Sequence, residues 1–461
     1  MKNKIIFSII LCLTIFKVNA QNDNWFDENG NLLPEYLDSK GLLADEYLAD
    51  AYEFKTLEEA MSNPLRVIKL NLSNSNLEDF PMEIFHFLNL QVLDLSSNKV
   101  EVIPSEILNL TKLQYIALNN NHLSTLPPDI GVLKNLIMLD LENNRIEFLP
   151  DEVCGLENLQ NLVLADNNLL RLPKNIGKMS KLNNLSLPNN NIQEIPESIG
   201  ALSELQSLDV SSNNLQSVPK SMSKLQALMI CDLRDNKIMS VPESISALKH
   251  LPYLNLSNNN ITNVPKKIGE MEFLQMLELN KNKISSLPSS ICDLQMLQEL
   301  DVSENNLSSL PDNFFQLNFL SKLCLDNNNF TELPDFETLI NLTELNISNN
   351  QLEMLPIGIE MCIGLQSLIA NHNNISEIPN LENFYELETV DFSYNKLTEI
   401  PTNILNLTSI KEIKLNNNQI QTLPELYNIK SDLIIDLSHN RISPEDIETI
   451  KNNQNLQSIK L

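Results

Sequence analysis

The sequence predicts an α/β solenoid, with a parallel β-sheet on the concave side and short helical or irregular segments on the convex side. Three observations lead to this fold class. A pattern of apolar residues recurs every 23 residues along most of the chain. Each period holds an L-x-L triplet whose alternation is typical of a short strand. An Asn and a Pro then follow at constant positions, and Pro prevents further ladder pairing.

The clearest repeat spans residues 136–150 and reads L-x-x-L-x-L-x-x-N-x-I-x-x-L-P. The same skeleton stands 23 residues earlier, at 113–127, and 23 residues later, at 159–173. Counting from Val67, we find 17 repeats and a truncated eighteenth. A single repeat buries too few apolar side chains to offset the cost of ordering it, so the stability must come from stacked neighbours.

This pattern resembles the leucine-rich repeat family over nearly the whole chain after residue 66. The resemblance implies a horseshoe and a ladder of Asn side chains at the ninth position of each repeat. An amide both donates and accepts hydrogen bonds, so it can satisfy backbone groups exposed where the chain leaves each strand. The predicted ladder is Asn98, Asn121, Asn144, Asn167, Asn190, Asn213, Asn236, Asn259, Asn282, Asn305, Asn328, Asn350, Asn373, Asn395, Asn418 and Asn440.

Residues 1–20 have the form of a signal peptide. Lys2 and Lys4 give a basic start, residues 5–16 are apolar, and small residues precede a cleavage site near Ala20. Twelve apolar residues are too few to span a bilayer. We therefore predict a protein that is secreted, periplasmic or held at the cell surface. A cytosolic location is the alternative, because intracellular family members share this repeat.

Residues 21–66 precede the repeats, which we place at 67–461. A capping box, Thr56-Leu-Glu-Glu59, predicts a short helix that ends near Ser62. We expect this segment to cover the first repeat, because the end of a solenoid needs an atypical unit. A small separate binding element is the alternative.

The formal net charge of −28 argues against nucleic acid and anionic membranes as partners. No apolar run after residue 20 is long enough for a transmembrane helix. Cys154 and Cys292 occupy the same position six repeats apart, about 29 Å at the strand spacing, so we expect no disulfide between them. Cys231 replaces a core leucine and should be buried. Three repeats, starting at 320, 365 and 410, have 22 residues and should change the curvature.

The sequence contains no sign of catalysis. Its five histidines are scattered, and we find no metal-ligand spacing, phosphate loop or nucleophile elbow. We predict a protein that is not an enzyme and uses no cofactor or metal.

The outward positions of the concave face are the third, fifth, seventh and eighth of each repeat. At the fifth, Asp209, Asp232, Asn255, Glu278 and Asp301 fall in successive repeats, about 5 Å apart. Such a row attracts a partner with Lys or Arg side chains. A solvated acidic row without a ligand is the alternative, because the family pattern supplies L-D-L-S by default. A calcium site is a further alternative.

Apolar residues occupy the third position beside this row. We predict that they contact a partner, because exposed apolar residues beside polar ones are typical of protein-binding surfaces. Alternatively, they pack on one another along the sheet. The residues are Ile230, Tyr253 and Met276, and, in earlier repeats, Val92, Tyr115 and Met138.

Three hypotheses for the function follow. In the first, the chain is an exported, non-catalytic scaffold whose concave face binds a protein partner with basic groups. A resemblance to secreted bacterial leucine-rich repeat proteins implies a role in adhesion, host contact or periplasmic scaffolding. In the second, it is the recognition part of a larger enzyme or receptor complex. In the third, it self-associates through the sheet edge near Leu461.

Overall fold

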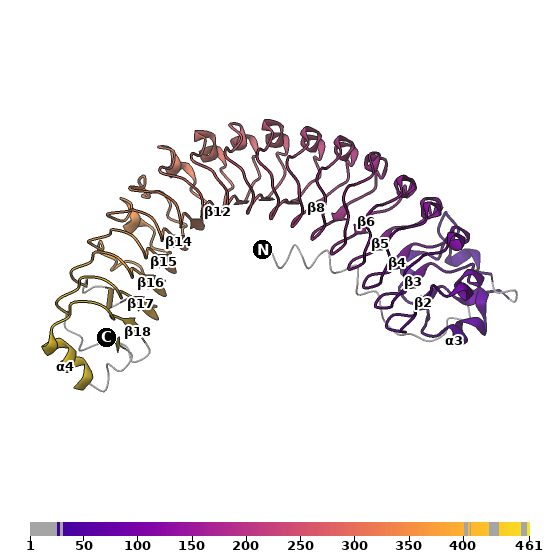
Figure 1. Cartoon of the computed structure of the whole chain (residues 1–461), viewed down its shortest axis with the longest axis horizontal. Helices are drawn as coiled ribbons and strands as arrows, with labels where there is room; N and C mark the ends of the chain where they lie inside the picture. Colours follow the sequence, from indigo (N-terminus) through magenta and orange to yellow (C-terminus); the bar gives the residue numbers. More distant parts are fainter. Residues whose placement is uncertain (1–24, 28–30, 401–403, 406, 424–432, 453–458) are drawn as a thin grey trace. The chain divides into compact units, whose positions relative to one another are not determined.

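The computed structural model describes residues 25–27, 31–400, 404–405, 407–423, 433–452 and 459–461 (Figure 1). The predicted signal peptide lies outside these residues. The chain divides into two compact units, Met1–Asn214 and Leu215–Leu461, and each is described by itself.

In each unit the strands are parallel and three residues long in nearly every repeat, covering the third to fifth positions. Neighbouring strands pair at equal positions, as Leu93 does with Ile116 and Leu277 with Leu300. The N-terminal unit contains β1 (Glu53–Phe54), β2 (Lys69–Asn71), β3 (Val92–Asp94), β4 (Tyr115–Ala117), β5 (Met138–Asp140), β6 (Asn161–Val163), β7 (Asn184–Ser186) and β8 (Ser207–Asp209). The C-terminal unit contains β9 (Ile230–Asp232), β10 (Tyr253–Asn255), β11 (Met276–Glu278), β12 (Glu299–Asp301), β13 (Lys322–Cys324), β14 (Glu344–Asn346), β15 (Ser367–Ile369), β16 (Thr389–Asp391), β17 (Glu412–Lys414), β18 (Ile434–Asp436) and β19 (Ile459–Lys460).

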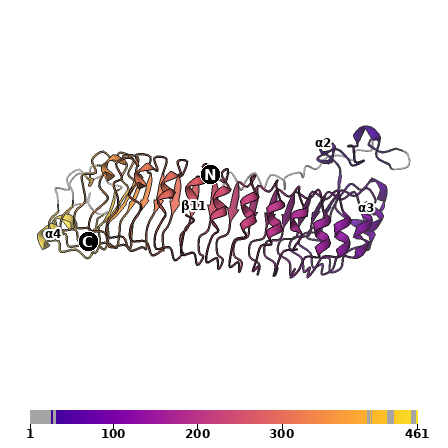
Figure 2. The same ribbon diagram turned by 90° about the horizontal axis from the view of Figure 1, so that it is seen from above.

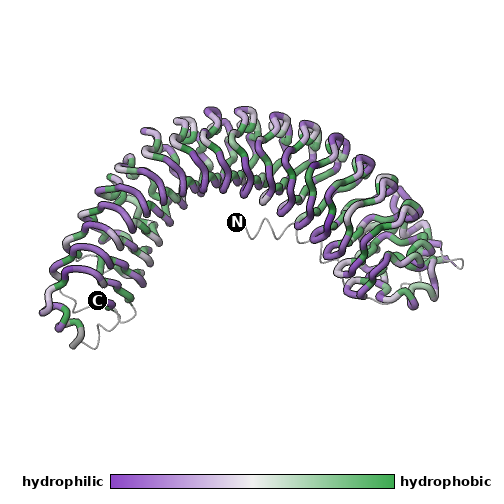
Figure 3. The backbone as a smooth tube through the Cα atoms, in the orientation of Figure 1, coloured by the Kyte–Doolittle hydropathy of each residue, from purple (hydrophilic) through white to green (hydrophobic). Residues whose placement is uncertain are grey.

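The convex side consists mainly of short 3-10 helices, in agreement with the sequence prediction. Their apolar residues point back into the core, where Ile130 and Leu133 are fully buried. Figure 3 shows that apolar segments recur in every turn of the chain. The helices are η5 (Met82–His86), η6 (Ser105–Asn109), η7 (Pro128–Val132), η8 (Asp151–Gly155), η9 (Ile176–Lys178) and η10 (Glu197–Ala201) in the N-terminal unit, and η11 (Lys220–Lys224), η12 (Glu243–Ala247), η13 (Ile268–Glu270), η14 (Ser289–Asp293), η15 (Phe314–Gln316) and η16 (Ile359–Met361) in the C-terminal unit.

The ninth-position asparagines form hydrogen bonds between repeats, as predicted. Asn190 is representative. Its Nδ2 donates to the carbonyl oxygens of Leu164 at 2.8 Å and Leu187 at 3.1 Å, and its Oδ1 accepts from the backbone nitrogen of Leu169 at 2.9 Å. One buried side chain thus satisfies backbone groups of two repeats, which would otherwise be buried without a partner.

The residue before each ladder asparagine adopts a left-handed backbone conformation. For example, φ is 52° at Asn143 and 55° at Asp235. Asn and Asp tolerate this conformation better than most residues. This requirement explains why Asn-Asn and Asp-Asn pairs are common at these positions.

Two of the 22-residue repeats replace the 3-10 helix with an Asx turn. In the repeat from 320, Asp335 is the single residue between the proline and the core residue Phe336, and its Oδ1 accepts from the nitrogen of Glu337 at 2.7 Å. In the repeat from 365, the Oδ1 of Asn380 accepts from the nitrogen of Glu382 at 3.0 Å. A side-chain oxygen therefore closes the shorter turn in place of helical hydrogen bonds.

The segment before the repeats extends the sheet of the N-terminal unit. Helix α3 (Leu57–Met61) begins at Thr56, whose hydroxyl accepts from the nitrogen of Glu59 at 3.1 Å, as the capping box predicts. Strand β1 pairs with β2. Helix α2 (Asp45–Leu48) lies on one flank of the unit (Figure 2). In the C-terminal unit, α4 (Pro444–Asn452) is longer than the convex helices.

Candidate functional site

The fifth-position residues on the concave face of the C-terminal unit are less exposed than predicted. Asp232 and Asn255 are buried, and Glu278 and Asp301 are half-buried. Asp209 ends β8 in the N-terminal unit and is half-buried. The alternative of a solvated acidic row therefore does not hold at Asp232 and Asn255, which are buried.

These side chains stabilise the turn that follows each strand. The Oδ1 of Asp232 accepts from the nitrogen of Arg234 at 3.2 Å, and the Oδ1 of Asp301 accepts from Ser303 at 3.0 Å. Asp209 accepts from the nitrogen of Ser211 at 2.9 Å. The L-D-L-S pattern thus has a structural role, the Asx turn, which needs no ligand.

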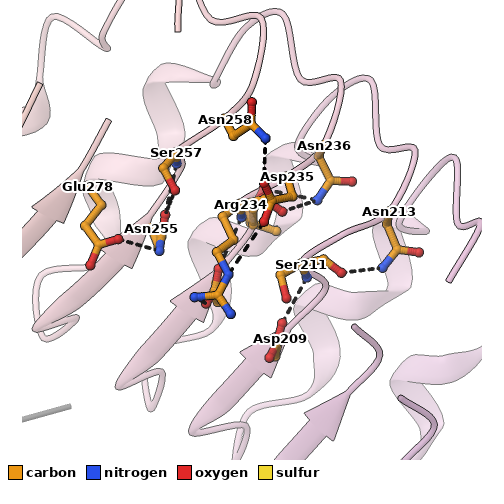
Figure 4. A network of polar contacts seen from close by, with 12 residues as sticks. Asp209, Ser211, Asn213, Arg234, Asp235, Asn236, Asn255, Ser257, Asn258 and Glu278 are labelled. Carbon is orange, nitrogen blue, oxygen red and sulfur yellow. Dashed lines mark hydrogen bonds and ion pairs between the residues drawn. The ribbon is translucent and has the colours of Figure 1, made fainter. Parts of the chain in front are cut away.

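Charged groups on this face are held in place by their neighbours (Figure 4). Arg234 lies 3.4 Å from the Oδ2 of Asp232 and 3.8 Å from that of Asp235. The Oε2 of Glu278 accepts from the Nδ2 of Asn255 at 2.7 Å. Arg234 is exposed, so it offers a cation within the predicted acidic row. The row therefore has mixed charge.

The third-position residues are also largely covered. Tyr253 and Met276 are buried, and Ile230 is half-buried. Neighbouring strands align Ile230 with Tyr253 and Tyr253 with Met276, so the three residues lie side by side along the sheet. The alternative in which they pack on one another agrees better with this burial. Burial, with the nearby Glu278 and Asp232 carboxylates, raises the pKa of Tyr253 well above its usual value, so its hydroxyl remains protonated.

In the N-terminal unit, the preceding segment covers part of the predicted surface. Trp25, Tyr36 and Tyr47 form a cluster with ring centroids 5.2 to 5.9 Å apart. This part of the segment packs against Val92 and Tyr115. Tyr115, which the sequence predicts to face outward, is half-buried, because residues far away in sequence contact it. Met138 is half-buried.

Asp140 is the most unusual acid on the concave side of the N-terminal unit. It is buried on β5, and its Oδ1 accepts from the nitrogen of Glu142 at 3.1 Å. Burial, with smaller contributions from the Glu142 and Asp94 carboxylates, raises the pKa of Asp140 from 3.8 to about 6. This carboxyl group is therefore harder to ionise than an exposed aspartate.

Sequence reasoning missed several charged groups at the third position. Glu299 and Lys322 are half-buried on β12 and β13, and Glu344 on β14 is exposed. The Nζ of Lys322 lies 3.2 Å from the Oε2 of Glu344. The third-position alignment could have revealed them, because Glu299 and Lys322 follow Met276 in the same column.

Two of the thiols are held protonated by their surroundings. On the convex side, Cys154 lines a recess of about 620 Å³ formed mainly by residues of η7 and η8. Burial, with the nearby Asp151 carboxylate, raises its pKa to about 11, and burial also raises that of Cys324 to about 12, so both thiols are protonated at neutral pH. Cys231 is fully buried, as expected of a residue in a leucine position.

Among the described residues, no three His, Cys, Asp or Glu side chains are grouped closely enough to hold a metal ion. No helix in the described ranges has both the length and the apolar character of a membrane span.

Family models match most of the repeat region. The model "Leucine-rich repeat region" matches residues 105–189, 174–249 and 232–323. "Leucine rich repeat" models match 66–123, 341–362 and 386–407. No curated protein sequence matches significantly.

Solved structures with the same fold come from bacteria and plants. A leucine-rich repeat protein of Leptospira interrogans, LIC12759, is 30% identical, with a TM-score of 0.67, over 89% of this chain and 99% of that one. The plant peptide hormone receptor RGFR1, solved with RGF2, is 25% identical, with a TM-score of 0.60, over 88% and 84%. Internalin InlF of Listeria monocytogenes is 26% identical, with a TM-score of 0.57, over 65% and 86%. The chain therefore belongs to the leucine-rich repeat family, whose fold is typically a non-catalytic scaffold for protein–protein interaction.

Proposed function

We propose that this protein is an exported, non-catalytic scaffold that binds a protein partner on the concave face of β9–β14. The observation that carries the proposal is the arrangement of its charged groups. Arg234 and Glu278 are held by hydrogen bonds and ion pairs before any partner arrives. Prearranged groups lose little conformational entropy on binding, which favours affinity and specificity.

The charge of this face favours a partner with basic groups. Glu278, Glu299 and Glu344 are accessible and outnumber the cations Arg234 and Lys322. Opposite charge on the partner accelerates association and selects against acidic proteins. The similarity to RGFR1, solved with RGF2, supports a protein or peptide as the partner.

A capture experiment with matched variants tests this proposal. Glu299→Lys and Glu344→Lys should together abolish capture of a basic partner. Glu332→Lys and Glu353→Lys make the same charge change at exposed positions after the ladder asparagines, away from the strands. Equal capture by both double variants would contradict the proposal. Asp232 is unsuitable for this test, because it is buried and stabilises a turn.

Export is a separate part of the proposal. It rests on the composition of residues 1–20 and agrees with the bacterial relatives. When the full chain is expressed in bacteria, N-terminal sequencing of the protein outside the cytoplasm should begin near Gln21. A chain that keeps Met1 and stays in the cytosol would contradict it.

A further inference from the structure

The C-terminal unit carries a row of exposed apolar side chains outside the concave face. They stand one or two residues before the first leucine of six successive repeats and are 38% to 58% exposed. We call this row the flank stripe. It consists of Phe273, Met296, Phe319, Ile340, Ile363 and Tyr385.

Hydrogen bonds join neighbouring repeats beside the flank stripe. The nitrogen of Phe273 donates to the carbonyl oxygen of Lys249 at 3.0 Å. Further along, the Nδ2 of Asn341 donates to the carbonyl of Asn318 at 2.7 Å, and the hydroxyl of Thr408 donates to that of Tyr385 at 3.1 Å. At about 4.8 Å per repeat, the six side chains extend over about 24 Å.

The core does not explain the stripe. The leucine that follows in each repeat, such as Leu274 or Leu320, is fully buried and fills the interior. Most of the equivalent positions in the N-terminal unit hold polar residues, including Asn135, Lys181 and Glu204; Leu65 and Leu88 are the exposed apolar exceptions. The repeat therefore folds without apolar residues there, and an exposed apolar row of this length is typical of a binding surface.

The surroundings of the stripe are acidic. Asp293, Glu337, Glu360 and Glu382 are exposed on the convex side of the stripe, and none has an ion-pair partner among the described residues. Residues 273–385, which contain the whole stripe, hold 15 acidic residues and three basic ones, Lys281, Lys283 and Lys322. An apolar row with an acidic border complements a partner that has apolar and basic faces.

We propose that the flank stripe is a second docking surface, which binds an amphipathic helix bearing Lys or Arg on a partner protein. A stripe of about 24 Å matches a helix of about 16 residues. A second copy of this chain fits poorly, because it would bring two acidic borders together. The flank stripe is distinct from the concave face, so an experiment can contradict one of the two binding proposals and leave the other intact.

A designed peptide tests this chemistry directly. The probe is about 18 residues long, with leucines at i, i+3, i+4 and i+7 and lysines on the other face. Its binding to the full chain is measured by fluorescence anisotropy. We expect the double variant Phe319→Ser, Ile363→Ser to bind at least about tenfold more weakly. The matched control, Met354→Ser with Ile357→Ser, removes exposed apolar residues elsewhere in the same unit and should stay within about twofold.

Control peptides and variants show which contacts hold the probe. A peptide with Glu in place of Lys should not bind, and one with the same composition but scattered leucines should bind weakly. Circular dichroism should show that both double variants remain folded. The proposal is overturned if the wild-type chain does not bind the probe, or if the two double variants bind alike. It also fails if Glu299→Lys with Glu344→Lys weakens binding as much, because the probe would then occupy the concave face. Loss of a wild-type dimer in the stripe variant, seen by sedimentation, would identify a second copy as the occupant.

Discussion

The two units have the same interior but different flanks. In the N-terminal unit, residues before the strands form ion pairs between repeats, such as Lys181 with Glu204 at 2.7 Å, and Asn158 donates to the carbonyl of Lys134 at 2.7 Å. In the C-terminal unit, six successive repeats hold the exposed flank stripe at these positions, and the Lys249–Glu272 ion pair lies at its start. The repeat folds with either polar or apolar residues at these flank positions. The flank is therefore free to vary with function, whereas the interior is not.

The first prediction tests whether the interiors are equivalent. Asn190 and Asn282 make the same set of hydrogen bonds in their respective units. Replacing either with Ala leaves buried backbone groups without partners and should destabilise its unit by about 3–5 kcal/mol. Hydrogen exchange of the adjacent strands measures this locally. Values that differ by more than about 1 kcal/mol would show that the interiors also differ.

The second prediction contrasts a packed convex turn with the open flank. A Cβ at Gly177 would overlap the carbonyl oxygen of Ser198, whereas at Gly364, beside Ile363 of the stripe, the nearest atom would be 3.8 Å away. Gly177→Ala should therefore cost about 3 kcal/mol, because backbone must move. Gly364→Ala should change the free energy of unfolding by less than about 1 kcal/mol. Urea denaturation compares them, and equal effects would contradict the open flank.

The third prediction concerns charge on the concave faces. In the N-terminal unit, Asp140 has no ion-pair partner among the described residues, whereas Asp232 in the C-terminal unit lies beside Arg234. The folded pKa of Asp140, about 6, exceeds the unfolded value of 3.8, so the folded state binds more protons between these values. Its contribution to stability therefore falls as pH rises from about 4 to about 6.

Asp140→Asn should remove this penalty. Asn can replace it, because Asn71 at the same repeat position accepts a backbone hydrogen bond from Ser73 at 3.0 Å. We expect the variant to be about 1–2 kcal/mol more stable than the wild type at pH 7 and equal to it below about pH 4. Denaturation curves at both pH values measure this. A difference that does not change with pH would show that the ionisation of Asp140 is not the cause.

The sequence predicted those features that repeat. Strand positions, the buried leucines and the Asn ladder recur at a fixed period, so one register determines them all. It did not predict the burial of Tyr253 and Met276 or the cover over Tyr115, because exposure depends on the sizes of side chains in neighbouring repeats and on a segment outside the period. The Asx role of Asp232 and the left-handed residue before each ladder asparagine were also missed, although both are visible as recurring Asp and Asn.

The last prediction has the smallest effect and bears most directly on the comparison. Lys181→Met removes an exposed ion pair of the N-terminal unit, and Phe319→Ser removes an exposed ring of the C-terminal unit. Each should change the free energy of unfolding by less than about 1 kcal/mol, because exposed pairs and exposed apolar groups contribute little. Thermal unfolding of the two variants measures this. If Phe319→Ser cost several kcal/mol, the flank stripe would be part of the core, and the difference between the flanks would reflect stability. A negligible cost leaves binding as the property that distinguishes them.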